Sequence, residues 1–285
     1  MKRIEDLRIS IFSDGADLQG ILEMQAKPWI RGFTTNPTLM RRAGVRNYEA
    51  FARSLLRAIP NRPISLEVFA DDESEMEMQA LTIATWGANV NVKIPITSRD
   101  GVFLGPLIRR LGAAGVTVNV TAILSLEQVN RVVESLAPET PAIVSVFAGR
   151  IADTGVDPVP LMTEARRILR WRPRAQLLWA SPRELLNIFQ ADGAGCDIIT
   201  VPPEMLRKIE LLGRDLQEYS RETVEMFHRD ASAAGYEIDV TAIVAARAAR
   251  RAMGMVSKNN FRRFNEIPGE IVGAGIGDPR GQPDA

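Results

Sequence analysis

Residues 89–94 read Asn-Val-Asn-Val-Lys-Ile, and in this stretch polar and apolar side chains alternate without a break. Because successive side chains on a β-strand point to opposite faces, the alternation predicts a strand with one apolar and one polar face. Lys93 lies on the polar face with two asparagines. The chain has 30 arginines but only five lysines, so a lysine inside an apolar run needs a specific explanation.

Three other runs divide in the same way. Asp14 follows Ile9–Ser13 on the face of Ser10 and Phe12, Glu67 lies on the polar face of Ile64–Phe69, and Thr121 shares a face with Thr117 and Asn119. Each of these polar residues falls late in its run. If the strands are parallel, their carboxyl ends meet at one edge, and these side chains gather there.

Eight short apolar runs, these four among them, alternate with longer amphipathic segments. This pattern predicts parallel β/α architecture and, at eight repeats, a closed (β/α)8 TIM barrel. An open doubly wound sheet is the alternative, but no G-x-G-x-x-G follows the first run. The expected strands are Ile9–Ser13, Gly32–Thr35, Ile64–Phe69, Val90–Ile94, Val116–Ala122, Ala142–Phe147, Gln176–Trp179 and Ile198–Val201. The expected helices are Asp17–Gln25, Tyr48–Ala58, Glu73–Thr85, Phe103–Ala113, Leu126–Leu136, Val159–Leu169, Arg183–Gln190 and Glu204–His228.

We expect residues 1–238 to form the barrel, which is the catalytic domain. Residues 239–265 follow as a helical extension, with a helix over Val240–Met253, and residues 266–285 read as a flexible tail because they hold repeated Gly and Pro with little apolar content.

The composition excludes several classes of partner and site. Thirty-five basic residues balance thirty-five acidic ones, so no net field attracts nucleic acid or an anionic membrane. No apolar run reaches the ~18 residues of a membrane span, and the first eight residues are too charged for a signal peptide. One histidine, His228, and one cysteine, Cys196, exclude multi-histidine metal sites, cysteine clusters and an internal disulfide. We therefore expect a soluble cytoplasmic protein with no metal and no cofactor.

In a barrel the polar strand faces point inward, where unpaired polar groups cost ~1–3 kcal/mol each and charges cost more. These inward-facing polar side chains form either a purely structural cluster or a functional site at the carboxyl ends of the strands. A buried amine is a nucleophile for carbonyl groups and forms a Schiff base. Lys93 would be that amine, with Asp14 and Glu67 as acid and base.

Five motifs, in this order along the chain, resemble the transaldolase and fructose-6-phosphate aldolase family, over roughly residues 8–238. They are Phe33-Thr34-Thr35-Asn36-Pro37-Thr38, Val92-Lys93-Ile94-Pro95, Asn119-Val120-Thr121, Phe147-Ala148-Gly149-Arg150 and Thr200-Val201-Pro202-Pro203. The resemblance implies a (β/α)8 barrel, class I aldol chemistry and sugar phosphate substrates, in carbohydrate metabolism of the pentose phosphate type. It also suggests a homo-oligomer.

Carried over by position, the resemblance makes Lys93 the group that attacks the C2 ketone of a ketose phosphate. Asp14 would take the C4 hydroxyl proton, and Glu67, with a water held by Thr121, would move protons around the carbinolamine. The resemblance also implies substrate-binding roles for the residues Thr34, Asn36, Asn119, Ser145, Phe147, Arg150, Ser181 and Arg183.

Arg150, Ser181 and Arg183 are the expected phosphate-binding residues. Ser181-Pro182-Arg183 follows the seventh run, and Ser at the N-cap with Pro at the first helical position fits a helix start, which attracts phosphate. Trp179, just before this segment, departs from the family pattern and could reshape the acceptor or phosphate end. Gly15 also departs from it.

Glu67 and Phe147 stand where the family's aldolase members usually carry Gln and Tyr. They favour transfer of a dihydroxyacetone unit to an aldehyde acceptor. The alternatives are an aldolase that releases dihydroxyacetone, a specialised transaldolase acting on a modified sugar, and a sugar-phosphate-binding barrel without turnover. The sequence leaves the donor, the acceptor and the oligomeric state open.

Overall fold

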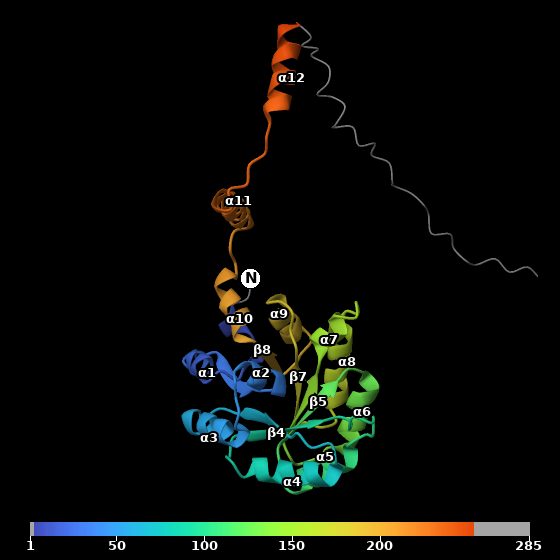
Figure 1. The fold of residues 1–285 in the computed structure, drawn as a ribbon. Helices are drawn as coiled ribbons and strands as arrows, with labels where there is room; N and C mark the ends of the chain where they lie inside the picture. The colour runs from blue at the N-terminus through green and yellow to red at the C-terminus, as the bar shows by residue number, and fades with distance from the viewer. Residues whose placement is uncertain (1–2, 254–285) are drawn as a thin grey trace, which may run out of the picture. The chain divides into compact units, whose positions relative to one another are not determined.

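The eight strands are short, and each pairs in parallel with its neighbours in sequence, while β8 closes on β1. The structure is a computed structural model that describes residues 3–253. It confirms the (β/α)8 barrel (Figure 1). The strands are β1 Ser10–Asp14, β2 Ile30–Thr34, β3 Ile64–Glu67, β4 Val90–Pro95, β5 Val118–Ile123, β6 Ala142–Val146, β7 Ala175–Trp179 and β8 Ile198–Val201.

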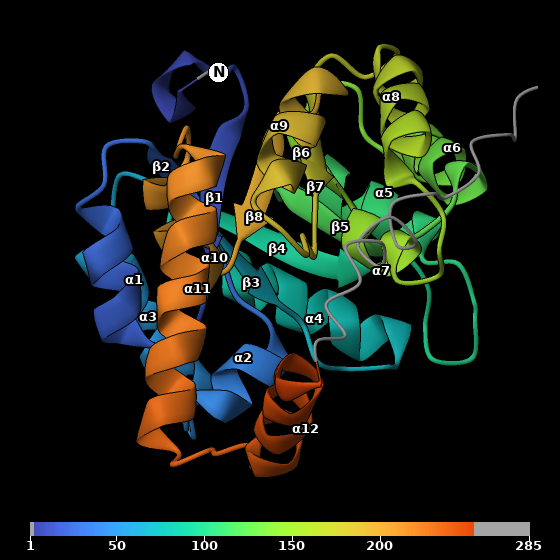
Figure 2. The ribbon, with the colours of Figure 1, turned by 90° about the horizontal axis from the view of Figure 1, so that it is seen from above.

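Helices follow the strands and pack on the outside of the barrel, as the view from above shows (Figure 2). Seven of the eight expected helices are found within three residues of their expected ends. The helices of the barrel region are η1 Ile4–Asp6, α1 Leu18–Gln25, α2 Pro37–Arg42, α3 Tyr48–Ala58, α4 Glu73–Ala84, α5 Gly105–Ala113, α6 Leu126–Ser135, α7 Ala148–Ala152, α8 Pro158–Leu169, α9 Leu186–Gly193, α10 Pro203–Leu206 and η2 Arg207–Leu211.

Seven of the described helices begin behind an Asp, Asn or Ser whose side-chain oxygen accepts a hydrogen bond from a backbone N–H of the first turn. Such caps satisfy donors that the helix itself leaves unpaired. The capping residues are Asp17, Asn36, Asn47, Asp72, Ser125, Asp157 and Asp215.

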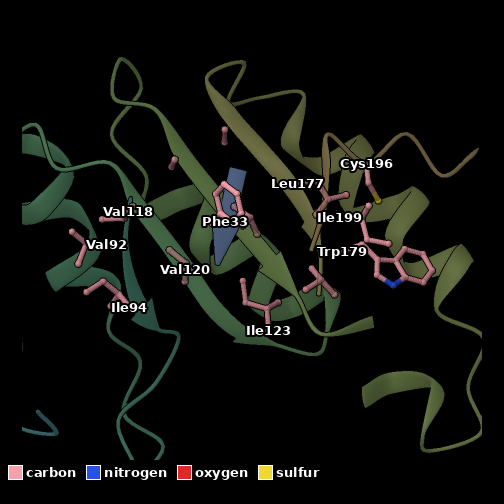
Figure 3. Close-up of a cluster of buried hydrophobic side chains, with 14 of the residues drawn as sticks. Phe33, Val92, Ile94, Val118, Val120, Ile123, Leu177, Trp179, Cys196 and Ile199 are labelled. Atoms are coloured by element: carbon pink, nitrogen blue, oxygen red, sulfur yellow. The ribbon is translucent and has the colours of Figure 1, made fainter. Parts of the chain in front are cut away.

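Two separate apolar cores follow from the strand alternation. The larger one lies between the barrel and its helices and includes Phe33, Val92 and Ile199 (Figure 3). The smaller one fills the inside of the barrel and consists of Phe12, Ile143, Leu178, Ala180 and Ile198. The Phe12 ring lies so close to Gly32 that a Cβ there would come within 2.5 Å of it. The inner face is therefore apolar below and polar towards the carboxyl ends.

The expectation that Trp179 shapes the phosphate end is wrong. Its side chain is fully buried in the larger core, beside Leu177 and Cys196, on the outward face of β7 (Figure 3). The inward positions of this strand end are Leu178 and Ala180. Trp179 therefore contributes to packing between barrel and helices.

The expected single helix over Glu204–His228 is also wrong, because the chain breaks after η2. Gly213 adopts a φ of +77°, which favours glycine and ends a helix. Asp215 then caps a new helix, α11 Leu216–Ala233. A last described helix, α12 Thr241–Ala252, confirms the helix expected over Val240–Met253.

The described residues divide into two compact units, with the boundary between Arg214 and Asp215. The first holds all eight strands. The boundary expected at residue 238 lies within the second unit and stays a prediction. The tail expected over residues 266–285 lies outside the described residues.

Candidate active site

A cavity of about 520 Å³ lies at the carboxyl ends of the strands. All twelve candidate site residues line it, although they come from seven different strands and the segments after them. They are Asp14, Thr34, Asn36, Glu67, Lys93, Asn119, Thr121, Ser145, Phe147, Arg150, Ser181 and Arg183. The barrel therefore brings together residues that are up to 169 positions apart in sequence.

Lys93 lies on the inward face of β4, paired in register with Glu67 of β3. Its ammonium Nζ donates to Glu67 Oε2 at 2.9 Å and to the backbone carbonyl of Thr35 at 2.9 Å. The Lys93 side chain is 10% exposed and that of Glu67 is 19% exposed. The lysine is thus held in a nearly dry pocket, next to a carboxylate that can exchange a proton with it.

Asp14, the last residue of β1, accepts a hydrogen bond from Thr34 Oγ1 at 2.7 Å. Burial raises the pKa of Asp14 above its ordinary value, and the bond from Thr34 and the charge of Lys93 offset part of this rise. A carboxylate with a raised pKa accepts a proton from a substrate hydroxyl more readily than an ordinary aspartate does.

A polar layer lies next to Lys93, across β3, β5 and β6. Asn119 donates its side-chain N–H to Ser65 Oγ at 3.0 Å and accepts a hydrogen bond from Ser145 Oγ at 2.6 Å. All three side chains are buried. Both ends of the Asn119 amide are therefore fixed in orientation, and its second N–H remains for a ligand.

A bulge at the end of β5 presents Thr121 to the cavity. The register with β6 shifts between Val120 and Ile123, and Ala122 adopts a left-handed φ of +62°. The extra residue shifts the inward–outward alternation by one position, so that Ile123 lies in the outer core instead of facing inward like Thr121 (Figure 3). Bulges of this kind often re-aim side chains beside active sites.

The expected phosphate end is built differently from the prediction. Ser181 does not begin a helix, because α9 starts at Leu186, and Ser181 itself has a left-handed φ of +59°. Its carbonyl oxygen lies where a Cβ of Gly149 would be, 1.5 Å away, so only glycine lets the two loops approach. This contact sets the loop of Arg150 directly against the loop of Arg183.

Arg183 is already engaged at this end of the cavity. It donates Nε and Nη2 to the carboxylate of Asp153 and Nη1 to the Ser181 carbonyl. Its partner Asp153, at the end of α7, has a pKa lowered first by these hydrogen bonds and also by the charges of Arg183 and Arg150. Arg150 lies with its guanidinium carbon 5.6 Å from the centre of the Phe147 ring.

The sequence reasoning missed several residues of the site. Thr38, Leu39 and Arg42 line the cavity from α2, a helix that was not expected. The signal for it was Asn36-Pro37, since Asn36 Oδ1 caps α2 by accepting from the backbone N–H of Leu39 at 3.0 Å. Thr200 of β8 also lines the cavity.

The described residues contain no group of three or more His, Cys, Asp or Glu side chains that could hold a metal ion. Over the same part of the chain, no helix is long and apolar enough to cross a membrane. Cys196 is buried and unpaired, as expected from its place beside β8.

Comparison with known proteins agrees with the geometry. The sequence matches the family described as Transaldolase/Fructose-6-phosphate aldolase over residues 11–252. A probable transaldolase of Dehalococcoides mccartyi is 34% identical over 200 residues, which cover 70% of this chain and 89% of that protein. A probable transaldolase of Hyphomonas neptunium is 32% identical over 232 residues, covering 81% of this chain and 100% of that protein. A probable transaldolase of Nitrosopumilus maritimus is 32% identical over 203 residues.

Proposed function

Because the chain belongs to the transaldolase and fructose-6-phosphate aldolase family, we propose that it moves a dihydroxyacetone unit from a ketose phosphate to an aldehyde acceptor through a Schiff base on Lys93. The observation that carries this proposal is the position of the Lys93 ammonium, nearly buried and 2.9 Å from Glu67, in a cavity also lined by Asp14. This is the arrangement of nucleophile, proton acceptor and second carboxylate that the reaction requires.

The first half of the reaction forms the covalent bond. Lys93 passes a proton to Glu67 over their hydrogen bond, and the free amine attacks the C2 ketone. The carbinolamine then loses water, with Glu67 returning the proton to the departing hydroxyl, and Thr121 holding the water between them. The Schiff base draws electrons from the C3–C4 bond.

In the second half, Asp14 takes the proton of the C4 hydroxyl, the C3–C4 bond breaks and the first aldehyde leaves. The dihydroxyacetone carbons stay on Lys93 as an enamine, whose hydroxyls Asn36 and Asn119 would hold. An incoming aldehyde is attacked by the enamine carbon, and Asp14 returns its proton to the new alkoxide. Hydrolysis of the Schiff base then frees the longer ketose and Lys93.

Phosphate groups would bind at Arg150, Ser181 and Arg183, with Thr34, Ser145 and Phe147 lining the cavity around the sugar. Glu67 and Phe147 support transfer over free release. Phe147 has no hydroxyl, so it cannot deliver a proton to the enamine as a tyrosine there could. An aldolase that releases dihydroxyacetone is the second candidate, since the family includes both activities.

Borohydride reduction in the presence of fructose 6-phosphate tests the proposal. We expect an adduct of the three-carbon unit on the peptide that contains Lys93, and none in Lys93→Met. Product analysis by mass spectrometry then separates the two candidates. Transfer lengthens erythrose 4-phosphate by three carbons, whereas an aldolase releases free dihydroxyacetone at a comparable rate without any acceptor. A panel of other aldehydes tests for a modified acceptor sugar.

We further propose that the protein works in the cytoplasm, in sugar phosphate metabolism of the pentose phosphate type, and as a homo-oligomer. Apolar side chains on α11 and α12, among them Phe227 and Ile243, are not buried within their own unit. They support an oligomer because burial between copies would remove them from water. Size-exclusion chromatography of the full chain, and of a chain lacking residues 239–285, measures the native mass and the contribution of the extension.

A further inference from the structure

Three side chains form a continuous chain of hydrogen bonds across the seam where the barrel closes. Thr34 Oγ1 of β2 donates to Asp14 Oδ1 of β1 at 2.7 Å, and it lies 2.5 Å from Thr200 Oγ1 of β8. Thr34 and Thr200 are both buried. Thr200 has no part in the mechanism described above, although it lines the same cavity.

Counting protons gives the direction of these bonds. An ionised carboxylate only accepts hydrogen bonds, so the single hydroxyl proton of Thr34 points to Asp14. Thr34 then has no proton left for its second contact. Thr200 must therefore donate to Thr34, and the order of donation is Thr200 to Thr34 to Asp14.

A hydroxyl that accepts a hydrogen bond becomes a stronger donor, because the bonds in a chain polarise one another. The bond from Thr200 therefore strengthens the bond that Thr34 gives to the Asp14 carboxylate. We propose that Thr200 is a positioning residue, which acts through Thr34 to hold Asp14 in place and to favour its ionised form. This proposal rests on the proposed function, because it assigns Thr200 a part in the step that needs ionised Asp14.

The chain of hydroxyls also suits the other state of Asp14. Once Asp14 has taken the C4 proton, its carboxyl can donate to Thr34, and Thr34 can turn its own proton to Thr200. No proton leaves these three residues in this rearrangement, in which the Thr200 proton turns away from Thr34 towards the cavity that Thr200 lines. The two hydroxyls thus serve both halves of the reaction without a change in the backbone.

Charged groups from several other elements also act on Asp14. Lys93 favours its ionised form, whereas Glu67 and Glu204 disfavour it. Further charged residues line the two cavities that Asp14 borders, and they are Asp17, Arg42, Arg150, Arg183 and Arg207. None of these has a hydrogen bond to Asp14 in the described structure, where Thr34 is its one side-chain donor. The hydrogen-bond relay from Thr200 through Thr34 to Asp14 is therefore the contribution to the ionisation of Asp14 that a single substitution can isolate.

The variant that tests the relay is Thr200→Val, which keeps the side-chain shape and removes only the hydroxyl. Thr200→Ser restores the hydroxyl. Ser13→Ala is the matched control, because Ser13 lies next to Asp14 and its buried Oγ has no hydrogen-bond partner in the described structure. Two quantities are measured from pH 4 to 9 for each protein: kcat for transfer, and the carboxyl ¹³C shift of Asp14, assigned with Asp14→Asn.

We expect the Asp14 titration and the acid limb of kcat in Thr200→Val to move upward together, by about 0.5 pH unit. On the acid side of the wild-type midpoint this lowers kcat by up to about threefold, and at high pH the rates converge with those of the wild type. Thr200→Ser and Ser13→Ala keep the wild-type midpoints. A loss of kcat that is equal at every pH would indicate packing alone and overturn the proposal, as would an unmoved Asp14 titration.

The relay and the proposed function fail in different ways. If the wild type forms no adduct on Lys93, the proposed function is wrong, but the Asp14 titration still decides whether Thr200 acts on this carboxyl. If Lys93 is trapped normally and the titration does not move in Thr200→Val, only the relay is wrong. Should Thr200→Val fail to fold, Thr200→Ala takes its place in the same measurements.

Discussion

Arg183 donates Nε and Nη2 to the two carboxylate oxygens of Asp153, at 2.8 and 2.5 Å, across the loops that follow β6 and β7. The two N–H groups on one edge of an arginine form paired hydrogen bonds with one anion at a time. The Asp153 carboxylate therefore occupies the edge of Arg183 that a phosphate would use. With Arg150 close enough to lower the pKa of Asp153 as well, two guanidiniums share one negative charge at this end of the cavity.

We expect Asp153→Asn to tighten the binding of phosphorylated substrates, because it frees Arg183 and removes a competing negative charge. The KM for fructose 6-phosphate should fall by about two- to fivefold, a modest change because the ion pair is exposed to solvent. The KM for unphosphorylated glyceraldehyde as acceptor should stay constant. Initial rates with each substrate measure both values.

Glu164→Gln provides the control, because Glu164 makes a similar two-pronged ion pair with Arg167 on α8 and does not line the cavity. A rise in the KM for phosphorylated substrates in Asp153→Asn would contradict the prediction. It would mean that Asp153 holds Arg183 in its binding position instead of competing for it.

A second prediction concerns Tyr48, whose hydroxyl donates to the carbonyl of Glu67 at 3.0 Å and accepts from its N–H at 2.8 Å. Pairing of β2 with β3 ends at Thr34 and Ser65, so the backbone groups of Glu67 on that side have no strand partner. Burial raises the pKa of Tyr48, which keeps the hydroxyl protonated and able to donate. Tyr48 thereby holds the end of β3 that carries the partner of Lys93.

Tyr48→Phe should lower kcat with little change in KM, and slow the formation of the Schiff base in rapid-mixing experiments. It should also cost about 1–3 kcal/mol in the free energy of unfolding, because two backbone groups lose their partner. Trp86→Phe is the control: its ring packs against Tyr48 at 5.6 Å, and its buried Nε1 has no hydrogen-bond partner in the described structure. Equal kinetic losses in both variants would show that aromatic packing, not the hydroxyl, positions Glu67.

The positions of site residues on strands could be predicted from the sequence, whereas contacts between loops could not. The alternation around Lys93 and Glu67 determines which side chains face the barrel interior, and the β/α order places their strand ends together, so the cavity follows from pattern alone. The ion pair of Arg183 with Asp153 does not, because it depends on how two loops meet in space. The same holds for Ser181, which has the residue types of a helix start but lies in a left-handed turn against Gly149.

The β5 bulge offers a third prediction, because a non-glycine residue with a left-handed φ costs roughly 1–2 kcal/mol. Ala122→Val adds a branched Cβ at this position, φ +62°. We expect it to lower the free energy of unfolding by about 2 kcal/mol and to reduce kcat, since the backbone that aims Thr121 must shift. Ala122→Gly should stay within about 1 kcal/mol of the wild type, because relief of strain and greater freedom of the unfolded chain oppose each other. Urea unfolding measures both variants, and equal stability of the two would contradict the role of strain.

The raised pKa of Asp14 predicts how stability depends on pH. Its folded pKa lies above the ordinary value of 3.8, so between these two values the folded state binds more protons than the unfolded state. Stability therefore falls as the pH rises through this window, and above it the full cost of the buried charge remains. Asp14→Asn removes that cost. It should be more stable than the wild type at pH 8, and the difference should shrink as the pH falls towards 3.8, while activity is lost at every pH.

Asp71→Asn is the control of opposite sign, because hydrogen bonds from the Arg99 backbone and side chain lower the pKa of Asp71. It should be less stable than the wild type at pH 8, with the difference closing in acid. Urea unfolding at pH 4 and pH 8 gives all the required values, and a gain in Asp14→Asn that is equal at both would show that Asp14 carries no buried charge.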